Sequence, residues 1–371
     1  MVKIGIDVGY GYTKAIAMSE NGIKKVSFPS LAYSKTANAK KVADLMKAAE
    51  VASIMGSGKS NKAFYEVGFA GMEYYIPVSS DFVLDEEISI EKEGVERYYD
   101  NSILALLLLG IVLVGKEKGT KEIVCQIATG LPISFYSSEN AKQLKKLLLN
   151  NNRPWQITID GIEYTVYVEK AVVLVQGVAV AFSYVFDVDG IGIIENQDRS
   201  SILKSTFAVI DVGMYTTDIA VFDHAQPLPG AVTSVNVAVN NILTTLSLLV
   251  NNDSFGVRQV IEKIIYQHLA GEHVSLQYRK IYDAIKNDIN TVINDTAKVI
   301  TERAISIPYL QDVENIIFAG GGAELFGEVI KQELKKKIER KVKIEKINKS
   351  ELANATGYLV YLLLTPSKIR R

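Results

Sequence analysis

The sequence Ile-Asp-Val-Gly occurs twice, at Asp7 and at Asp211, and each copy ends a short apolar run. A turn-like segment, a threonine and a second apolar run follow each copy, which is the pattern of a strand–turn–strand hairpin. A chain of 371 residues exceeds one ordinary compact core. Two similar hairpins so far apart therefore predict two related domains in one chain.

The turns of both predicted hairpins have the residues of a phosphate-binding loop. Consecutive backbone N–H groups in such turns form a nest for phosphate oxygens. Asp7 and Asp211 place a carboxylate at the lip of each turn, where Mg²⁺ would bind with its waters. Lys14, just past the first turn, is positioned to neutralise a phosphate. A single Asp-x-Gly turn is usually structural, but two copies in one frame favour phosphate binding. The glycines that allow close backbone approach are Gly9, Gly11 and Gly213.

A third glycine-rich segment, residues 320–322, follows the apolar run 316–319 and precedes a predicted helix. A backbone of three glycines can lie flat against a base or sugar, and the N-terminus of the next helix favours a phosphate. The alternative is a helix-entry turn that is packed tightly for structural reasons.

Composition excludes several classes of function. With 41 basic and 42 acidic residues the net charge is -1, so no overall field attracts nucleic acid or anionic lipid. One basic run, made of residues 335–337 with Arg340, Lys341 and Lys343, is either a solvated helix face or a contact for DNA or an acidic partner. The single cysteine, Cys125, excludes an intramolecular disulfide and is expected to be a buried thiol in a reducing compartment.

The sequence also lacks membrane and export signals. The most apolar stretch, residues 103–114, is too short to span a bilayer and predicts a buried helix. The N-terminus has no long apolar region with a cleavage site, which predicts a cytoplasmic protein. Gly58-Lys59-Ser60 resembles the end of a P-loop, but the upstream glycine that the motif requires is absent, so we expect a surface loop there.

The order of these features resembles the superfamily of actin, sugar kinases and large heat-shock chaperones. Within it, residues 7–14 and Phe28-Pro29-Ser30 look most like the prokaryotic actin-like proteins, which are the ParM-type plasmid-segregating filaments and the archaeal actin-like ATPases. The resemblance implies an α/β actin-like fold with two related ribonuclease-H-like domains flanking a nucleotide cleft. Domain I would comprise residues 1–180 and 353–371, and domain II residues 181–352. The matching features are a phosphate hairpin (4–14), a crossover strand (124–131), a second hairpin (209–218), a glycine-rich adenosine loop (316–325) and a closing helix (353–364).

The resemblance also implies a role for each candidate residue. Asp7 and Asp211 would hold hydrated Mg²⁺, and Asp211 would lie near the attacking water. Gln176 matches the Glu or Gln with which relatives orient that water. Its neutral amide is a poor base, which favours slow hydrolysis, and its alternative role is to cap a helix. The phosphates would be held by Gly9, Tyr10, Gly11, Tyr12, Thr13 and Lys14 on one side and by Gly213, Met214, Tyr215 and Thr216 on the other. The adenosine would be bracketed by Gly320, Gly321, Gly322 and Leu325.

Three segments depart from the family pattern. Met214-Tyr215 stands where many relatives have small residues, so this turn is expected to contact phosphate through its backbone. Residues 236–240 replace glycines that relatives carry near the sugar, and Asn240 is the candidate substitute for ribose contacts. Glu262 and Lys263 stand on the helix that contacts base and ribose in relatives, although that helix face could equally be solvated.

Three functions remain open from the sequence. The first is a filament protein that binds ATP or GTP with Mg²⁺, hydrolyses it and self-associates, with a DNA-bound adaptor as a possible partner in plasmid or DNA segregation. The second is a small-molecule kinase of the same fold, for which no motif places the required carboxylate base. The third is a nucleotide switch that does not polymerise. No sequence motif points to direct nucleic-acid binding.

Overall fold

The computed structural model describes residues 1–54, 62–79, 95–190, 192–252 and 255–365, and within them the chain forms two compact units. Unit 1 comprises the described residues up to 200 together with 352–365, and unit 2 comprises those from 201 to 351. The two units divide after Ser200. Gly58-Lys59-Ser60 lies outside the described residues.

The elements of unit 1 are the strands β1 (Val2–Val8), β2 (Tyr12–Ser19), β3 (Gly22–Pro29), β4 (Tyr33–Ser34), β5 (Phe64–Phe69), β6 (Met72–Pro77), β7 (Glu122–Leu131), β8 (Trp155–Ile159), β9 (Ile162–Val175), β10 (Phe186–Val188) and β11 (Ile193–Glu195) and the helices α1 (Lys35–Ile54), α2 (Asn101–Gly115), α3 (Ser138–Leu148), α4 (Gln176–Val185) and α10 (Ala353–Leu364). Those of unit 2 are the strands β12 (Thr206–Val212), β13 (Thr217–Asp223), β14 (Gln226–Val235), β15 (Asn315–Ala319) and β16 (Lys343–Lys346) and the helices α5 (Val239–Leu249), α6 (Phe255–Leu269), α7 (Arg279–Ile285), α8 (Ile289–Ile305) and α9 (Ala323–Lys337).

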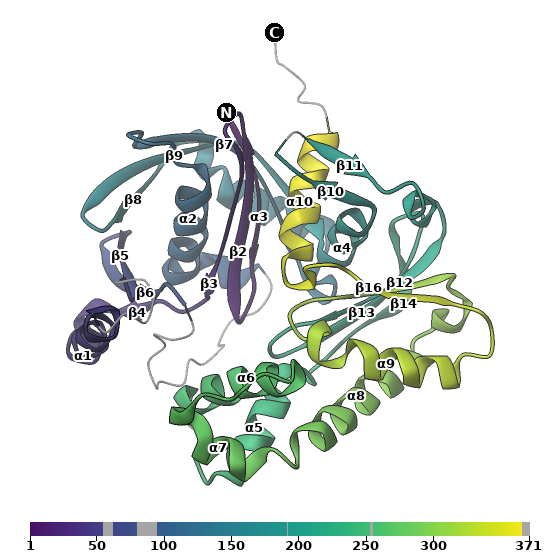
Figure 1. The fold of residues 1–371 in the computed structure, drawn as a ribbon. Helices are drawn as coiled ribbons and strands as arrows, with labels where there is room; N and C mark the ends of the chain where they lie inside the picture. The colour runs from purple at the N-terminus through teal and green to yellow at the C-terminus, as the bar shows by residue number, and fades with distance from the viewer. Residues whose placement is uncertain (55–61, 80–94, 191, 253–254, 366–371) are drawn as a thin grey trace. The chain divides into compact units, whose positions relative to one another are not determined.

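The large sheet of unit 1 has the strand order β3-β2-β1-β7-β9-β8-β5-β6-β4. Helix α2 packs on one face of this sheet, and α10 with α4 packs on the other (Figure 1). Strand β1 serves both faces because its side chains alternate. Ile4 and Ile6 are buried in the core that contains α2, whereas Gly5 faces α10, where a Cβ would lie 2.6 Å from the backbone nitrogen of Leu359.

The predicted buried helix is confirmed as α2. Its residues 104–112 are all buried, and the Asp100 carboxylate caps its N-terminus by accepting a hydrogen bond from the backbone N–H of Ser102 at 2.8 Å. In the part of the chain that the structure describes, no helix combines the length and the apolar character needed to cross a membrane.

Unit 2 repeats the arrangement of the first strands of unit 1. Its sheet has the order β14-β13-β12-β15-β16, with antiparallel pairing on the β13 side of β12 and parallel pairing on the β15 side. In unit 1, β3-β2-β1-β7-β9 follow in the same order with the same directions. The repeated hairpin in the sequence therefore marks a repeated α/β topology.

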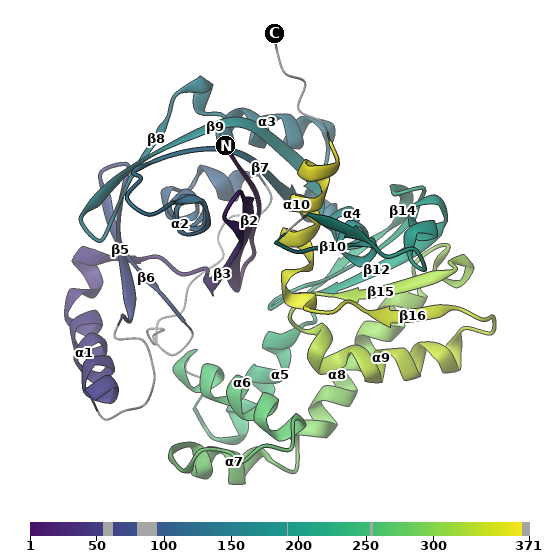
Figure 2. The ribbon, with the colours of Figure 1, turned by 45° about the horizontal axis from the view of Figure 1, so that its top comes forward.

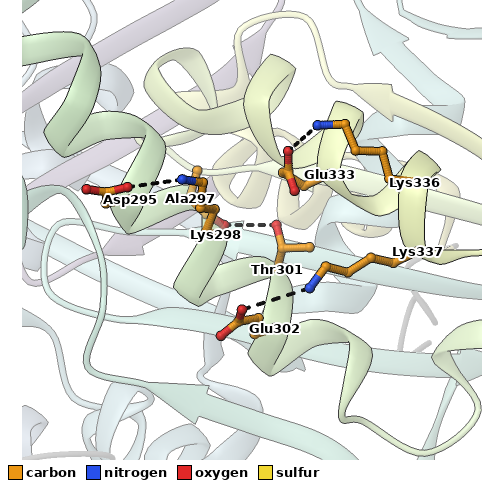
Figure 3. Close-up of polar contacts among 8 residues, drawn as sticks. All are labelled: Asp295, Ala297, Lys298, Thr301, Glu302, Glu333, Lys336 and Lys337. Atoms are coloured by element: carbon orange, nitrogen blue, oxygen red, sulfur yellow. Dashed lines mark hydrogen bonds and ion pairs between the residues drawn. The ribbon is translucent and has the colours of Figure 1, made fainter.

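The helices α8 and α9 of unit 2 pack against one another (Figure 2), and the last turn of α9 carries the basic residues 335–337. Lys336 and Lys337 are 68% and 40% exposed, and both lie near carboxylates. The exposure of these lysines agrees with a solvated helix face. Exposed ion pairs of this kind contribute little to stability. The pairs drawn in Figure 3 are Lys336–Glu333 (2.6 Å), Lys298–Asp295 (3.2 Å) and Lys337–Glu302 (3.9 Å), the last joining α9 to α8.

The expected crossover strand (124–131) lies within β7, which reaches Leu131 because residues 129–131 pair with residues 173–175 of β9. Gly130 pairs with Leu174, and a Cβ at this position would overlap the hydroxyl of Tyr358 in α10, so the strand requires a glycine here. Strand β9 runs unbroken from Ile162 to Val175. Strands β10 and β11 form a short antiparallel pair.

Candidate functional site

The first phosphate hairpin is the tight connection between β1 and β2. The strands pair so that Asp7 stands opposite Lys14. The backbone N–H of Gly9 donates to the carbonyl oxygen of Tyr12 at 3.1 Å and closes the turn. A Cβ on Gly9 would lie 2.9 Å from that same oxygen, which explains why glycine is required at this position. Lys14 is half-buried and forms no ion pair with the described residues.

Other parts of unit 1 hold the carbonyl oxygens of this turn. The Arg97 guanidinium donates from Nη1 to the carbonyl of Val8 at 2.8 Å and from Nη2 to that of Gly9 at 2.9 Å. The N–H of Ser30 donates to the carbonyl of Gly11 at 2.9 Å. The Ser30 hydroxyl also lies 2.9 Å from that of Thr13, and both side chains are buried. Ser30 of the Phe-Pro-Ser segment thus connects the end of β3 to the turn through hydrogen bonds. Arg97 was not predicted from the sequence as a residue of this site.

The second phosphate hairpin joins β12 and β13 and closes in the same way. The N–H of Gly213 donates to the carbonyl of Thr216 at 2.8 Å. The N–H of Gly322 donates to the carbonyl of Val212 at 2.9 Å, and that of Asn240 donates to the carbonyl of Met214 at 2.8 Å. The start of α5 and the glycine-rich turn 320–322 therefore both meet this hairpin, as the candidate site in unit 2 requires.

The three glycines of the turn 320–322 have different roles. Gly320 has φ +83°, and a Cβ there would overlap the carbonyl of Val212 and lie 2.5 Å from a carboxylate oxygen of Asp211. Gly322 packs against the Val212 side chain. Nothing lies within 4 Å of a Cβ placed on Gly321, so this position faces open space. Leu325 is 5% exposed on the first turn of α9 and belongs to the core of unit 2.

The two hairpin carboxylates are nearly buried, with Asp7 7% and Asp211 9% exposed. Asp218 stands opposite Asp211, in the register position that Lys14 has opposite Asp7. Burial raises the pKa of Asp218 to about 6; a hydrogen bond with Ser234 lowers it, and the Asp211 charge raises it. One buried oxygen of Asp218 has no hydrogen-bond partner within the described structure. The sequence reasoning did not single out Asp218, although its matching position in the repeated hairpin was a usable signal.

Within unit 2, Asp211 and Asp218 are carboxylates of the kind that bind a hydrated Mg²⁺. No group of three or more His, Cys, Asp or Glu side chains that could hold a metal occurs among the described residues. Mg²⁺ usually binds through one or two carboxylates and keeps several waters. The unpartnered Asp218 oxygen beside Asp211 adds to the acidic character of the second hairpin.

Helix α6 also adjoins the glycine-rich turn, since the Tyr266 hydroxyl lies 3.4 Å from the carbonyl of Gly321. Glu262 stands one turn earlier on the same face of α6. Burial raises the pKa of Glu262 to about 7, so its surroundings are not those of a solvated face. Arg258, on the preceding turn, approaches the side-chain oxygen of Asn240 at 3.4 Å. Lys263 is half-buried.

Gln176 is the first residue of α4 and directly follows β9. Val175 occupies the N-cap position, where no side chain makes a capping bond. The Gln176 side chain is half-buried and makes no hydrogen bond with the described residues, which argues against the capping role. The predicted buried thiol is confirmed, because Cys125 is fully buried and burial raises its pKa to about 12.

Two family profiles match the chain. The profile described as "Actin like proteins N terminal domain" matches residues 5–178. The profile described as "Archaeal actin homologue MreB-like, C-terminal" matches residues 209–336. No curated protein sequence matches the chain.

Solved structures with the same fold cover almost the whole chain. Actin-like protein Alp7A has a TM-score of 0.67 at 16% identity, with 97% of this chain and 95% of that chain covered. An archaeal actin homologue, Ta0583, in complex with ADP has a TM-score of 0.62 at 20% identity, with 96% and 98% covered. ParM of Bacillus thuringiensis with ATP has a TM-score of 0.62 at 16% identity, with 98% of each chain covered. At these identities the likeness shows a shared fold.

Proposed function

The chain belongs to the actin-like ATPase superfamily, and on this premise we propose that it binds Mg²⁺–ATP, hydrolyses it and assembles with copies of itself into nucleotide-dependent filaments. The observation that carries the proposal is the repeated hairpin. Each unit has a closed turn with a nearly buried carboxylate, and other parts of the same unit hold the carbonyls of that turn.

Each hairpin has its own part in the proposed nucleotide binding. The turn at Gly9 and Lys14 would bind phosphate with N–H groups and a cation, and the turn at Gly213 would bind it through the backbone. Gly321 and the α6 face that carries Glu262 would accept the nucleoside. Asp7 and Asp211 would hold hydrated Mg²⁺, which supplies positive charge to the phosphates. Gln176 would orient the attacking water, and its low basicity fits slow hydrolysis.

Filament formation is proposed from the family and from neighbours that are named ParM and Alp7A. A head-to-tail contact between identical subunits does not close on itself, so it propagates as a helical filament. Such a filament would serve as a cytoskeletal element or move DNA, and in the second role its partner would be a DNA-bound adaptor protein.

The proposal is tested by pelleting and negative-stain microscopy with ATP, with GTP, with ADP and without nucleotide. We expect filaments that depend on a nucleoside triphosphate. Asp211→Ala should abolish hydrolysis while some binding remains, whereas Asp295→Ala, at an exposed position of α8, should leave hydrolysis intact. Soluble monomers under every condition would contradict polymerisation and favour a nucleotide switch. Unchanged hydrolysis in Asp211→Ala would contradict the site.

A further inference from the structure

Arg97 is a buried cation beneath the first phosphate hairpin. It lies in the short 3-10 helix Glu96–Tyr99, is 9% exposed, and stacks over the Tyr10 ring at 4.4 Å. Both of its hydrogen bonds go to carbonyl oxygens of the hairpin, those of Val8 and Gly9. It forms no ion pair with any residue that the structure describes. A buried guanidinium without a carboxylate partner is costly unless an anion comes near it.

The second hairpin shows what these bonds replace. The carbonyl of Val212, the counterpart of Val8, accepts from the backbone N–H of Gly322 at 2.9 Å. The carbonyl of Gly213, the counterpart of Gly9, is approached by the N–H of Val239 at 3.5 Å. In unit 2 two backbone N–H groups therefore hold the two carbonyls, whereas in unit 1 one forked side chain holds the equivalent pair.

Holding these carbonyls has a direct consequence for an anion. In a trans peptide the C=O and N–H groups point in opposite directions, and no cis peptide bond occurs in the described chain. When the Gly9 carbonyl points to Arg97, the N–H of Tyr10 in the same peptide group points away from Arg97. A carbonyl turned toward a phosphate would repel it, whereas an N–H attracts it.

We propose that Arg97 is a positioning residue for phosphate binding, which fixes the carbonyls of Val8 and Gly9 so that the first hairpin presents the N–H of Tyr10 and positive potential to a nucleoside di- or triphosphate. This inference rests on the proposed function, because it presumes that the hairpin binds nucleotide phosphates. Arg97 acts through the backbone of the turn and through its charge.

The test compares full-length wild-type protein with three variants. Arg97→Ala removes the fork and the charge. Arg97→Lys keeps the charge but cannot bridge two carbonyls in a planar fork. Arg199→Ala is the matched control, because Arg199 stacks over Tyr184 at 4.5 Å and donates to the backbone carbonyl of the same residue at 3.4 Å, and Tyr184 lies in α4, outside both hairpins. Affinities for Mg²⁺–ADP, Mg²⁺–ATP and adenosine are measured by calorimetry, and folding is checked by thermal unfolding.

For Arg97→Ala we expect the affinity for ADP and ATP to fall on the order of tenfold or more, because two charge-assisted hydrogen bonds are lost. Adenosine, which has no phosphate, should bind within about twofold of wild type. Arg97→Lys should recover part of the loss, and Arg199→Ala should match wild type.

Two results would overturn the inference. The first is ADP binding by both Arg97 variants that equals wild type. The second is a parallel loss of ADP and adenosine binding, which would indicate a structural role alone. If Arg97→Ala does not fold, Arg97→Lys tests the inference instead. Its loss of ADP affinity is then compared with its loss of adenosine affinity, both relative to wild type. A wild-type protein that binds no nucleotide refutes the proposed function itself, and the inference falls with it.

Discussion

Replacing Glu262 by Gln should make the ligand-free protein more stable at alkaline pH. Burial raises the pKa of this carboxyl from 4.5 to about 7, and it forms no hydrogen bond or ion pair with the described residues. Below pH 4.5 it is protonated in both the folded and the unfolded states. Between pH 4.5 and about 7 the folded state binds more protons, so stability falls as pH rises. Above about pH 7 the ionised carboxylate lowers the stability of the folded state by its full amount, which is roughly 3 kcal/mol at 1.36 kcal/mol per pKa unit.

The assay is urea unfolding of wild type and Glu262→Gln from pH 5 to pH 8.5, together with hydrogen exchange of the α6 amides. Hydrogen exchange is needed because a chain with two units need not unfold in one step. The difference between the two proteins cancels the titration of all other groups. We expect Glu262→Gln to be more stable by roughly 3 kcal/mol at pH 8.5 and by much less near pH 5.

Glu272→Gln is the matched control, because it makes the same chemical change at an exposed position just after α6. It should leave the stability curve unchanged within about 0.5 kcal/mol. The reasoning is refuted if the stability difference for Glu262→Gln does not change with pH. It is also refuted if the difference grows toward acid pH, because that would mean a stabilising charged carboxylate.

Two further predictions concern single positions. Gly320→Ala should destabilise the protein by about 1–3 kcal/mol in urea unfolding, because φ is +83° and a Cβ would overlap Val212. Gly321→Ala should leave stability unchanged. Equal stability of the two variants would contradict the geometry. Cys125 should not react with a thiol reagent at pH 8 in the native protein and should react fully in urea, because burial raises its pKa to about 12; rapid native reaction would contradict this.

Local sequence patterns predicted the elements that depend on nearby residues. The helices α2 and α10 and the strands β1 and β12 have clear apolar runs and end at turn or cap residues, so their existence follows from the chain itself. The continuation of β7 through Gly130 is different. A glycine inside a strand pattern usually weakens the strand, but here it leaves room for Tyr358 of helix α10. No local pattern contains that contact.

Long-range contacts also limited the prediction of the site. The two carboxylates and the glycines were visible because they repeat in one frame. Arg97 was not, because the segment that carries it meets Val8 and Gly9 only after the chain folds. Glu262 was a candidate from the family resemblance, but the cost of its charge depends on how the surrounding protein excludes water.

The repeated hairpins began as equivalent motifs, and the structure makes them chemically unequal. Opposite Asp7 the ladder places Lys14, whereas opposite Asp211 it places Asp218. The first turn is held by the Arg97 guanidinium, and the second is held by backbone N–H groups that carry no net charge. The positive charge therefore gathers at the first hairpin and the negative charge at the second. Phosphate should depend more on the first hairpin for binding, and a divalent cation should depend more on the second.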